Sequence, residues 1–320
     1  MKRCRLIVNP ISGTRSKQGL GEALAARLGP DWTVETCPTE YAGHATTLAA
    51  EAAAAGYDAV IAAGGDGTVN ETARALCGTA TALGIIPCGS GNGLARHLNI
   101  PVDNVASLDI IAGGRTLDVD TGSVNGRPFF CTFGVGFDAA VSERFARKSR
   151  RGLFSYFQSA LETFRNYRPQ TYTITANGSE VTHKALLVAV CNASQYGNNA
   201  YIAPGASMLD GLFDVLILHS DNPLSAVRLG LDMMAGTLGS NAGVDMIRTS
   251  SLTITSLSDD ISHIDGEPVE SLGERFVLEC RPATLRVFVP ENIPAFTPLI
   301  TPLQAFGRDI LLTFSHLFRQ

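Results

Sequence analysis

One eight-residue stretch, Gly-Gly-Asp-Gly-Thr-Val-Asn-Glu at positions 64–71, constrains the fold more than any other part of this chain. It follows an apolar run at residues 57–63 that predicts a buried strand, and it precedes residues 72–77, which predict the first turns of a helix. Glycines let the backbone approach an anion, and the amino end of a helix offers unpaired N–H groups with partial positive charge. The stretch therefore predicts a phosphate-binding turn between a strand and a helix. A plain turn that needs small residues is the alternative, which the polar residues among the glycines disfavour.

Similar junctions are predicted on both sides of this stretch. Strands are expected at residues 5–8, 32–36 and 82–86, and each leads into a polar or glycine-containing turn, with helices expected at 16–28 and 45–55. Strands that alternate with helices predict a parallel sheet with helices on its faces. The turns should gather at the carboxyl ends of the strands, where such sheets bind ligands. Taken one by one, the same turns are explained equally well as loops and helix caps.

The pattern changes near residue 116. Short alternating segments follow, separated by turn signals that include Asn125-Gly126 and Asn177-Gly178. The chain is therefore expected to comprise an α/β domain at 1–116, an antiparallel β-sandwich at 117–290, and an amphipathic carboxyl-terminal segment at 291–320. That last segment is expected to pack on the first domain or on a partner copy in a homodimer, and a membrane-surface helix is the alternative.

Composition excludes several classes of protein. The 25 Lys and Arg residues against 30 Asp and Glu residues give a net charge of −5, which argues against a general nucleic-acid binder. The seven cysteines are odd in number and form no Cys-x-x-Cys pair, and the six histidines show no metal-ligand spacing. No apolar run of about 18 residues and no signal core are present, so neither a spanning helix nor a leader is expected. These features predict a cytoplasmic protein with reduced cysteines.

The 64–71 stretch resembles the nucleotide-binding signature of the diacylglycerol kinase catalytic-domain family, which includes bacterial lipid kinases, sphingosine kinases and ceramide kinases. Its Gly-Gly-Asp-Gly core is also shared with NAD kinases, so this stretch alone does not define the substrate. The resemblance extends from residues 9–13, through residues 87–96, to an Asp-Gly-Glu sequence at 265–267. The middle segment is similar to the sphingosine and ceramide kinases, whereas many bacterial relatives have threonine where this chain has Ser90. This departure weakly favours a sphingoid or ceramide-like lipid.

The resemblance implies an NAD-kinase-like α/β nucleotide-binding domain and a β-sandwich domain, with ATP and Mg²⁺ bound in the cleft between them. It assigns the nucleotide to residues in four turns, which are Asn9, Pro10, Ile11, Ser12, Gly13, Thr39, Gly65, Asp66, Gly67, Thr68, Val69, Asn70, Glu71 and Ser90.

The resemblance also implies the catalytic groups. Glu267 matches the residue that accepts the proton of the lipid hydroxyl, and Asp265 would assist by binding Mg²⁺ or by placing the hydroxyl. Asp66 is the alternative base. On local evidence alone, residues 264–268 would be a hairpin turn with charged ends.

Two further sites are carried over from the family. Asp138 lies in an apolar segment at 129–141 that is similar to the family segment beside the lipid, so it is expected to bind the substrate head group. Ser207, Asp210 and Leu212 match a structural Mg²⁺ site, with oxygen ligands of the kind hard cations prefer. The alternatives are a turn residue for Asp138 and a simple turn into a strand for Asp210.

The substrate is expected at a membrane surface. Residues 144–151 carry four arginines and one lysine with aromatic residues nearby, which is typical either of a solvated face or of a patch that contacts anionic lipids. The sequence thus predicts an ATP-dependent lipid kinase that associates peripherally with membranes. A kinase of a soluble substrate such as NAD, and a regulator without catalytic activity, are the alternatives.

Overall fold

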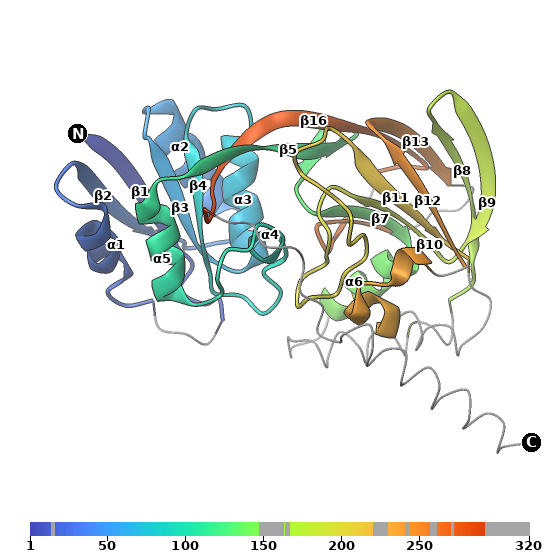
Figure 1. Ribbon diagram of the computed structural model, residues 1–320, viewed down its shortest axis with the longest axis horizontal. Coiled ribbons are helices and arrows are strands. Elements are labelled where there is room, and N and C mark those ends of the chain that lie inside the picture. Colours follow the sequence, from blue (N-terminus) through green and yellow to red (C-terminus); the bar gives the residue numbers. More distant parts are fainter. Residues whose placement is uncertain are drawn as a thin grey trace, which may run out of the picture.

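The computed structural model describes residues 1–13, 17–146, 163, 167–219, 230–240, 243–256, 261–269 and 272–291. The described chain forms an α/β domain and a β domain side by side, as Figure 1 shows. The predicted basic segment at 144–151 lies outside the described residues from 147 onward. The predicted amphipathic segment at 291–320 lies outside them from 292 onward. No helix among the described residues is long and apolar enough to cross a membrane.

The α/β domain has four parallel strands in the order β2-β1-β3-β4. The strands are β1 (Lys2–Val8), β2 (Trp32–Pro38), β3 (Ala59–Gly64) and β4 (Ala82–Pro87). All six residues of β3 and of β4 are buried, as expected for strands covered on both faces. The predicted parallel sheet is confirmed.

Helices cover both faces of this sheet. They are α1 (Leu20–Leu28), α2 (His44–Ala54), α3 (Asp66–Leu76), α4 (Gly93–His97) and α5 (Asn104–Gly113). Residues of α1 and α5 pack in one apolar core and residues of α2 and α3 in another, on opposite faces of the strands (Figure 1). The first helix begins at Leu20 rather than at residue 16 as predicted, because Gly19 precedes it with a left-handed φ of 76°.

The β domain packs two antiparallel layers face to face. One layer is a six-stranded sheet in the order β12-β11-β10-β7-β14-β15, and the other is formed by β13, β8, β9 and the strands paired with them. The strands are β5 (Thr116–Val124), β6 (Arg127–Phe129), β7 (Thr132–Gly136), β8 (Gln170–Ala176), β9 (Ser179–Ala185), β10 (Leu187–Cys191), β11 (Phe213–Leu218), β12 (Val244–Thr249), β13 (Ser251–Ser256), β14 (Ser262–Ile264), β15 (Glu267–Val269) and β16 (Arg275–Phe288). Buried residues from both layers form one core, so the predicted β-sandwich is confirmed.

Strand β16 joins the two domains. It pairs antiparallel with β13 and β5, and near its end Val287 pairs parallel with Leu83 of β4. The sequence predicts two strands here, at 275–281 and 285–289. The structure instead has a single strand whose register shifts between Arg281 and Leu285, where Ala283 has a left-handed φ of 52°. A ten-stranded sheet therefore runs from the α/β domain into the sandwich.

Tight hairpins occur where Asn-Gly pairs predicted them. Asn125-Gly126 joins β5 to β6, and Asn177-Gly178 joins β8 to β9. Both residues of each pair have positive φ, which a two-residue type I′ turn requires. The Asp265-Gly266 pair makes the same kind of turn between β14 and β15, with φ angles of 52° and 80°.

Candidate functional site

A cleft of about 1020 Å³ lies between the two domains, at the carboxyl ends of β1, β3 and β4. This is large enough for a nucleotide. Its α/β wall includes ten of the residues predicted to bind nucleotide, which are Asn9, Ile11, Ser12, Gly13, Gly65, Asp66, Gly67, Thr68, Asn70 and Ser90. Its β-sandwich wall includes Thr132, Tyr196, Gly197, Asn198, His263, Asp265 and Glu267. The structure thus brings the glycine-rich turns and the Asp-Gly-Glu turn to one cleft.

The two glycine turns of the α/β domain touch each other. A Cβ added at Gly89 would lie 2.7 Å from the Cα of Gly65, so a larger residue cannot occupy Gly89 without displacing the backbone. The carboxylate of Asp66 accepts the backbone N–H groups of Asn92 at 2.8 Å and Gly93 at 2.6 Å. Asp66 therefore ties the start of α4 to the start of α3. Gly65 has no side chain to cap α3, and Gly65, Asp66 and Gly67 line the cleft at the start of this helix.

The first turn is fixed to the same helix. The Asn9 amide donates to the Thr68 hydroxyl at 3.0 Å, and the Asn9 side-chain oxygen accepts the backbone N–H of Ile11 at 3.1 Å. The Asn9 side chain therefore sets the shape of its own turn and joins it to α3. This arrangement places Ser12 and Gly13 in the cleft wall.

Four of the predicted nucleotide residues, Pro10, Thr39, Val69 and Glu71, do not line the cleft. Val69 is buried in the α/β core. Glu71 accepts the backbone N–H groups of Gly43 at 2.8 Å and Ala45 at 3.2 Å. Its carboxylate therefore caps α2, a role that the local sequence did not suggest.

The Asp-Gly-Glu turn is held through Asp265. Its carboxylate accepts backbone N–H groups from Phe130, Cys131 and Thr132 at 2.6–3.2 Å. Burial raises the pKa of Asp265 to about 6, an effect that these N–H donors partly oppose. Asp265 thus fastens the turn to the start of β7.

Glu267 is the carboxylate of this turn that faces the α/β domain. It is the first residue of β15 and is exposed to the cleft. A Cβ added at Gly67 would lie 3.1 Å from Glu267 Oε1, so the carboxylate is directly opposite the first turn of α3. Two motifs that are two hundred residues apart in the chain therefore face each other across the cleft.

A buried cluster that the sequence did not reveal supports this turn. Asp138 accepts hydrogen bonds from Tyr196 Oη at 2.9 Å and from His263 Nε2 at 3.0 Å. His263 Nδ1 accepts the Gly266 backbone N–H at 3.3 Å, which assigns the proton to Nε2. Gly134 is required beside this pair, because a Cβ there would lie 2.2 Å from Asp138 Oδ2.

Asp138 itself does not line the cleft. Its side chain is almost completely buried at the start of α6 (Phe137–Ala146), and the cleft wall is formed by its partners Tyr196 and His263. Its expected contact with a lipid head group stays a prediction.

A loop from the β domain closes on the α/β domain. Asn198 donates its backbone N–H to the Gly91 carbonyl at 3.1 Å, and Arg96 bridges that carbonyl and the Asn199 side chain. Gly197, Asn198 and Asn199 all have positive φ, between 51° and 107°. Asparagine tolerates this region better than most residues, so the loop keeps the backbone shape that glycines would also adopt.

The loop predicted to bind a structural Mg²⁺ is already held by protein groups. Asp210 accepts the Leu212 backbone N–H at 3.0 Å and pairs with the guanidinium of Arg248. The Ser207 hydroxyl accepts the Leu209 backbone N–H at 3.2 Å. The oxygen atoms of Ser207, Asp210 and Leu212 suit a hard cation, but an ion here would have to share the Asp210 carboxylate with the Arg248 guanidinium. The metal site stays a prediction, and no mechanistic role is assigned to it.

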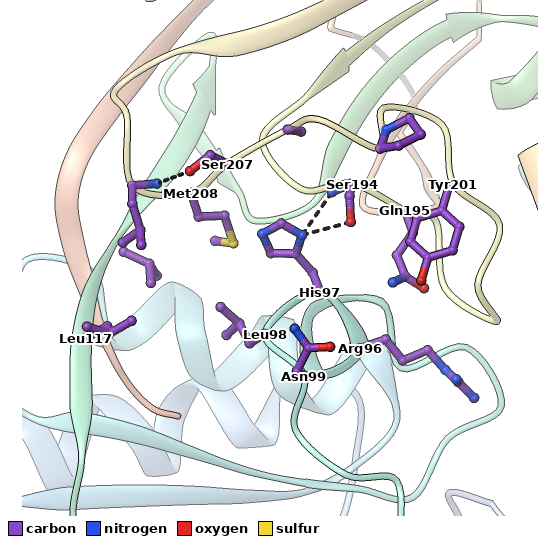
Figure 2. Close-up of a pocket in the computed structure, with 14 residues that line it drawn as sticks. Arg96, His97, Leu98, Asn99, Leu117, Ser194, Gln195, Tyr201, Ser207 and Met208 are labelled. Carbon is purple, nitrogen blue, oxygen red and sulfur yellow. Dashed lines mark hydrogen bonds between the residues drawn. The ribbon is translucent and has the colours of Figure 1, made fainter. Parts of the chain in front are cut away.

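A second cavity of about 210 Å³ lies between α4, β5 and the loop at 194–209 (Figure 2). His97 projects into it and accepts the Ser194 backbone N–H on Nδ1 at 3.1 Å. Burial lowers the pKa of His97 to about 4, so its imidazole is neutral near pH 7. The cavity is separate from the glycine-rich turns, and neither Glu267 nor Asp66 lines it.

The fold and the cleft define a protein in which an α/β domain and a β-sandwich enclose a ligand site between them. Residues 3–124 match the model of the diacylglycerol kinase catalytic domain, and residues 131–289 match the YegS C-terminal NAD kinase beta sandwich-like domain. The chain belongs to the diacylglycerol kinase catalytic-domain family.

Individual relatives agree with this assignment. A diacylglycerol kinase of Bacillus subtilis (strain 168) is 32% identical over 242 residues, which cover 74% of this chain and 80% of the relative. A diacylglycerol kinase of Staphylococcus aureus (strain bovine RF122 / ET3-1) is 30% identical over 301 residues, which cover 91% and 94%. A crystal structure from Bacillus anthracis str. Sterne, described as a diacylglycerol kinase, matches with a TM-score of 0.72 at 20% identity over 91% of this chain and 97% of the other. That last match bears on the fold alone.

Proposed function

We propose that this protein transfers the γ-phosphate of ATP to a hydroxyl group of a lipid. The observation that carries the proposal is the position of Glu267, opposite the first turn of α3 in the wall of the cleft. A phosphate bound at that helix end and a hydroxyl bound near Glu267 would meet inside one cleft.

The proposed chemistry needs few groups. The first turn of α3 and the Asn9 turn bind the phosphates, while Glu267 accepts the proton of the hydroxyl as its oxygen attacks the γ-phosphorus and ADP leaves. Mg²⁺ bound with ATP would neutralise charge on the phosphates, and the cleft side chains suited to hold it are Asp66 and Asn70. His263 orients the turn that carries Glu267, because it accepts the Gly266 N–H.

The geometry favours Glu267 over Asp66 as the base. Both oxygens of Asp66 accept short hydrogen bonds from the backbone of Asn92 and Gly93, so this carboxylate is engaged in joining two turns. Glu267 is exposed, lines the cleft from the sandwich side and lies opposite the first turn of α3.

The proposed acceptor is diacylglycerol or a related lipid alcohol. Support comes from the curated relatives, which are named diacylglycerol kinases and match over most of their length. Ceramide and sphingoid bases are alternative acceptors, because the segment around Ser90 is similar to that of the sphingosine and ceramide kinases. Action at a membrane surface, with residues 144–151 in contact with anionic lipid, belongs to the same proposal.

The test replaces Glu267→Gln and measures transfer of labelled phosphate from ATP to diacylglycerol, ceramide and sphingosine in mixed micelles. Turnover should fall about 10²–10⁴-fold, the usual contribution of a general base, while nucleotide binding stays unchanged. The matched control is Glu279→Gln, an exposed glutamate on β16, which should behave as wild type.

Two outcomes would contradict this proposal. Near-normal turnover of the Glu267→Gln variant would remove Glu267 from its role. Phosphorylation of NAD, offered alongside the lipids, with no lipid product would instead support a kinase of a soluble substrate.

A further inference from the structure

Three potential metal-binding side chains converge on the β-sandwich, and none of them lines the cleft. His183 belongs to β9, Asp245 belongs to β12, and His219 follows the last residue of β11. One ligand atom from each side chain lies within 4.8 Å of the other two. All three side chains are partly exposed, so an ion could reach them from solvent.

The hydrogen bonds of His219 point to a cation at this place. Its Nδ1 lies 3.2 Å from the Lys184 carbonyl, which can only accept, so Nδ1 must carry a proton. In the neutral ring, Nε2 then presents a lone pair to a carboxylate oxygen of Asp245 only 2.8 Å away. Two acceptors at that distance repel each other unless a proton or a metal ion lies between them. A ring N–H bonded to a backbone carbonyl is also the usual support of a metal-binding histidine.

His183 favours the metal ion over the proton. Its Nδ1 lies 3.9 Å from the same Asp245 oxygen, and its ring centroid lies 5.2 Å from that of His219. A proton shared by His219 and Asp245 needs no third ligand, whereas a metal ion does. Asp245 is the most exposed of the three, so a small rotation of its side chain can bring the ligand atoms to bonding distance.

The backbone holds two of these residues in place. His219 donates its backbone N–H to the Gly243 carbonyl at 2.8 Å, directly before β12, and Leu218 pairs with Val244. His183 is fixed by the β8–β9 hairpin, where it pairs with Tyr172. His183 therefore stands on a paired strand and His219 directly follows one, which limits the entropy lost when an ion binds.

We propose that His183, His219 and Asp245 form a Zn²⁺ site that joins the two sheets of the sandwich. Among the described strands, β9 is the last of the ten-stranded sheet and β12 is the edge of the six-stranded sheet. Figure 1 shows β9 along the outer border of the β domain. An ion bound by His183 and Asp245 would link these two edges, and water would complete a tetrahedral coordination. Two imidazoles and one carboxylate suit Zn²⁺ better than Mg²⁺.

The experiment uses the full chain after removal of metal with a chelator. Titration with ZnCl₂, followed by calorimetry, should show saturable binding of one ion for each chain. Saturating Zn²⁺ should raise the melting temperature by roughly 5 °C, because the ion binds the folded state only. MgCl₂ at the same concentration should give neither result at this site.

The deciding variant is His183→Gln. It should abolish the Zn²⁺-dependent shift while leaving the metal-free melting temperature unchanged, because His183 is not needed for the contact between His219 and Asp245. His44→Gln, a histidine on the α/β domain, is the matched control and should keep the full shift.

Two outcomes would overturn the proposal. If wild type shows no saturable Zn²⁺ binding, His219 and Asp245 form an ordinary ion pair and no metal site. A shift that is equal in wild type and His183→Gln locates the ion elsewhere. Kinase activity is not the readout, so this proposal and the proposed function stand or fall separately.

Discussion

Three carboxylates of the predicted motifs bind backbone N–H groups. Asp66, Glu71 and Asp265 each accept two or more of them, and each joins segments that are distant in the sequence. An ionised carboxylate forms strong hydrogen bonds of this kind, and the cost of leaving one unsatisfied in a buried site is high. Residues that sequence motifs suggest for chemistry therefore also determine the shape of the cleft.

Buried His97 gives a prediction about pH. Its pKa is lowered from 6.5 to about 4 in the folded protein, so between these values the unfolded chain binds the proton and the folded protein does not. The contribution of neutral His97 to the free energy of unfolding is therefore complete above pH 6.5. This contribution is lost as the pH falls toward 4, and the total loss is at most about 3 kcal/mol.

The measurement is urea unfolding of wild type and of His97→Asn, whose side-chain oxygen can still accept the Ser194 N–H. The difference in free energy of unfolding between wild type and His97→Asn should be constant above pH 7. Between pH 6.5 and 4, wild type should lose stability relative to the variant. Parallel pH profiles for the two proteins would contradict the buried, neutral imidazole. Subtracting the variant also removes the opposite contribution of Asp265, whose pKa is raised.

At the scale of elements, helices α2 and α3 are held together by the Glu71 carboxylate. Gly43 and Ala45 supply N–H groups at the start of α2, and no residue at the helix start caps them. A side chain from the neighbouring helix thus caps α2, a role that a serine or aspartate at the helix start usually has. The Glu71 carboxylate thus has a structural role, and its contact with nucleotide stays a prediction.

We expect Glu71→Gln to lower the free energy of unfolding by about 1–2 kcal/mol, because the amide presents a donor to one of the two N–H groups. The KM for ATP should change less than twofold, as expected for a residue outside the cleft wall. Glu40→Gln, an exposed residue of the preceding loop, is the control. A large rise in KM with unchanged stability would restore the nucleotide-binding role predicted from the sequence.

At the scale of the whole molecule, β16 makes the two domains interdependent. The α/β sheet ends at β4, whose outer edge is paired by the end of β16, and β5 runs beside β16 for most of its length. An isolated α/β domain would expose this edge of its sheet. Folding of the first domain therefore depends on a strand that ends near residue 288.

Because the two domains share this sheet, urea should unfold the full chain in a single transition. Trp32 is the only tryptophan and lies in β2 of the α/β domain, whereas far-ultraviolet circular dichroism reports on both domains. Urea denaturation should give the same midpoint by tryptophan fluorescence and by circular dichroism. A Trp32 transition that is clearly separated from the dichroism transition would show that the α/β domain unfolds independently.

Much of this protein follows from local sequence. The strand–turn–helix units could be predicted because an apolar run, a glycine turn and a helix start are adjacent in the chain. The Asn-Gly hairpins could be predicted because two residues with positive φ define the turn. The resemblance of short motifs in a specific order was enough to indicate the family and the cleft between two domains.

Other features exist only in the tertiary structure, because they depend on contacts between distant residues. The sequence does not indicate that His263 would meet Asp138, or that one strand would cross both domains. The histidines showed no metal-ligand spacing in the chain, yet His183 of β9 and His219, which follows β11, converge in the folded protein. Local sequence determined the elements and the glycine-rich turns, whereas long-range strand pairing decided which side chains share a site.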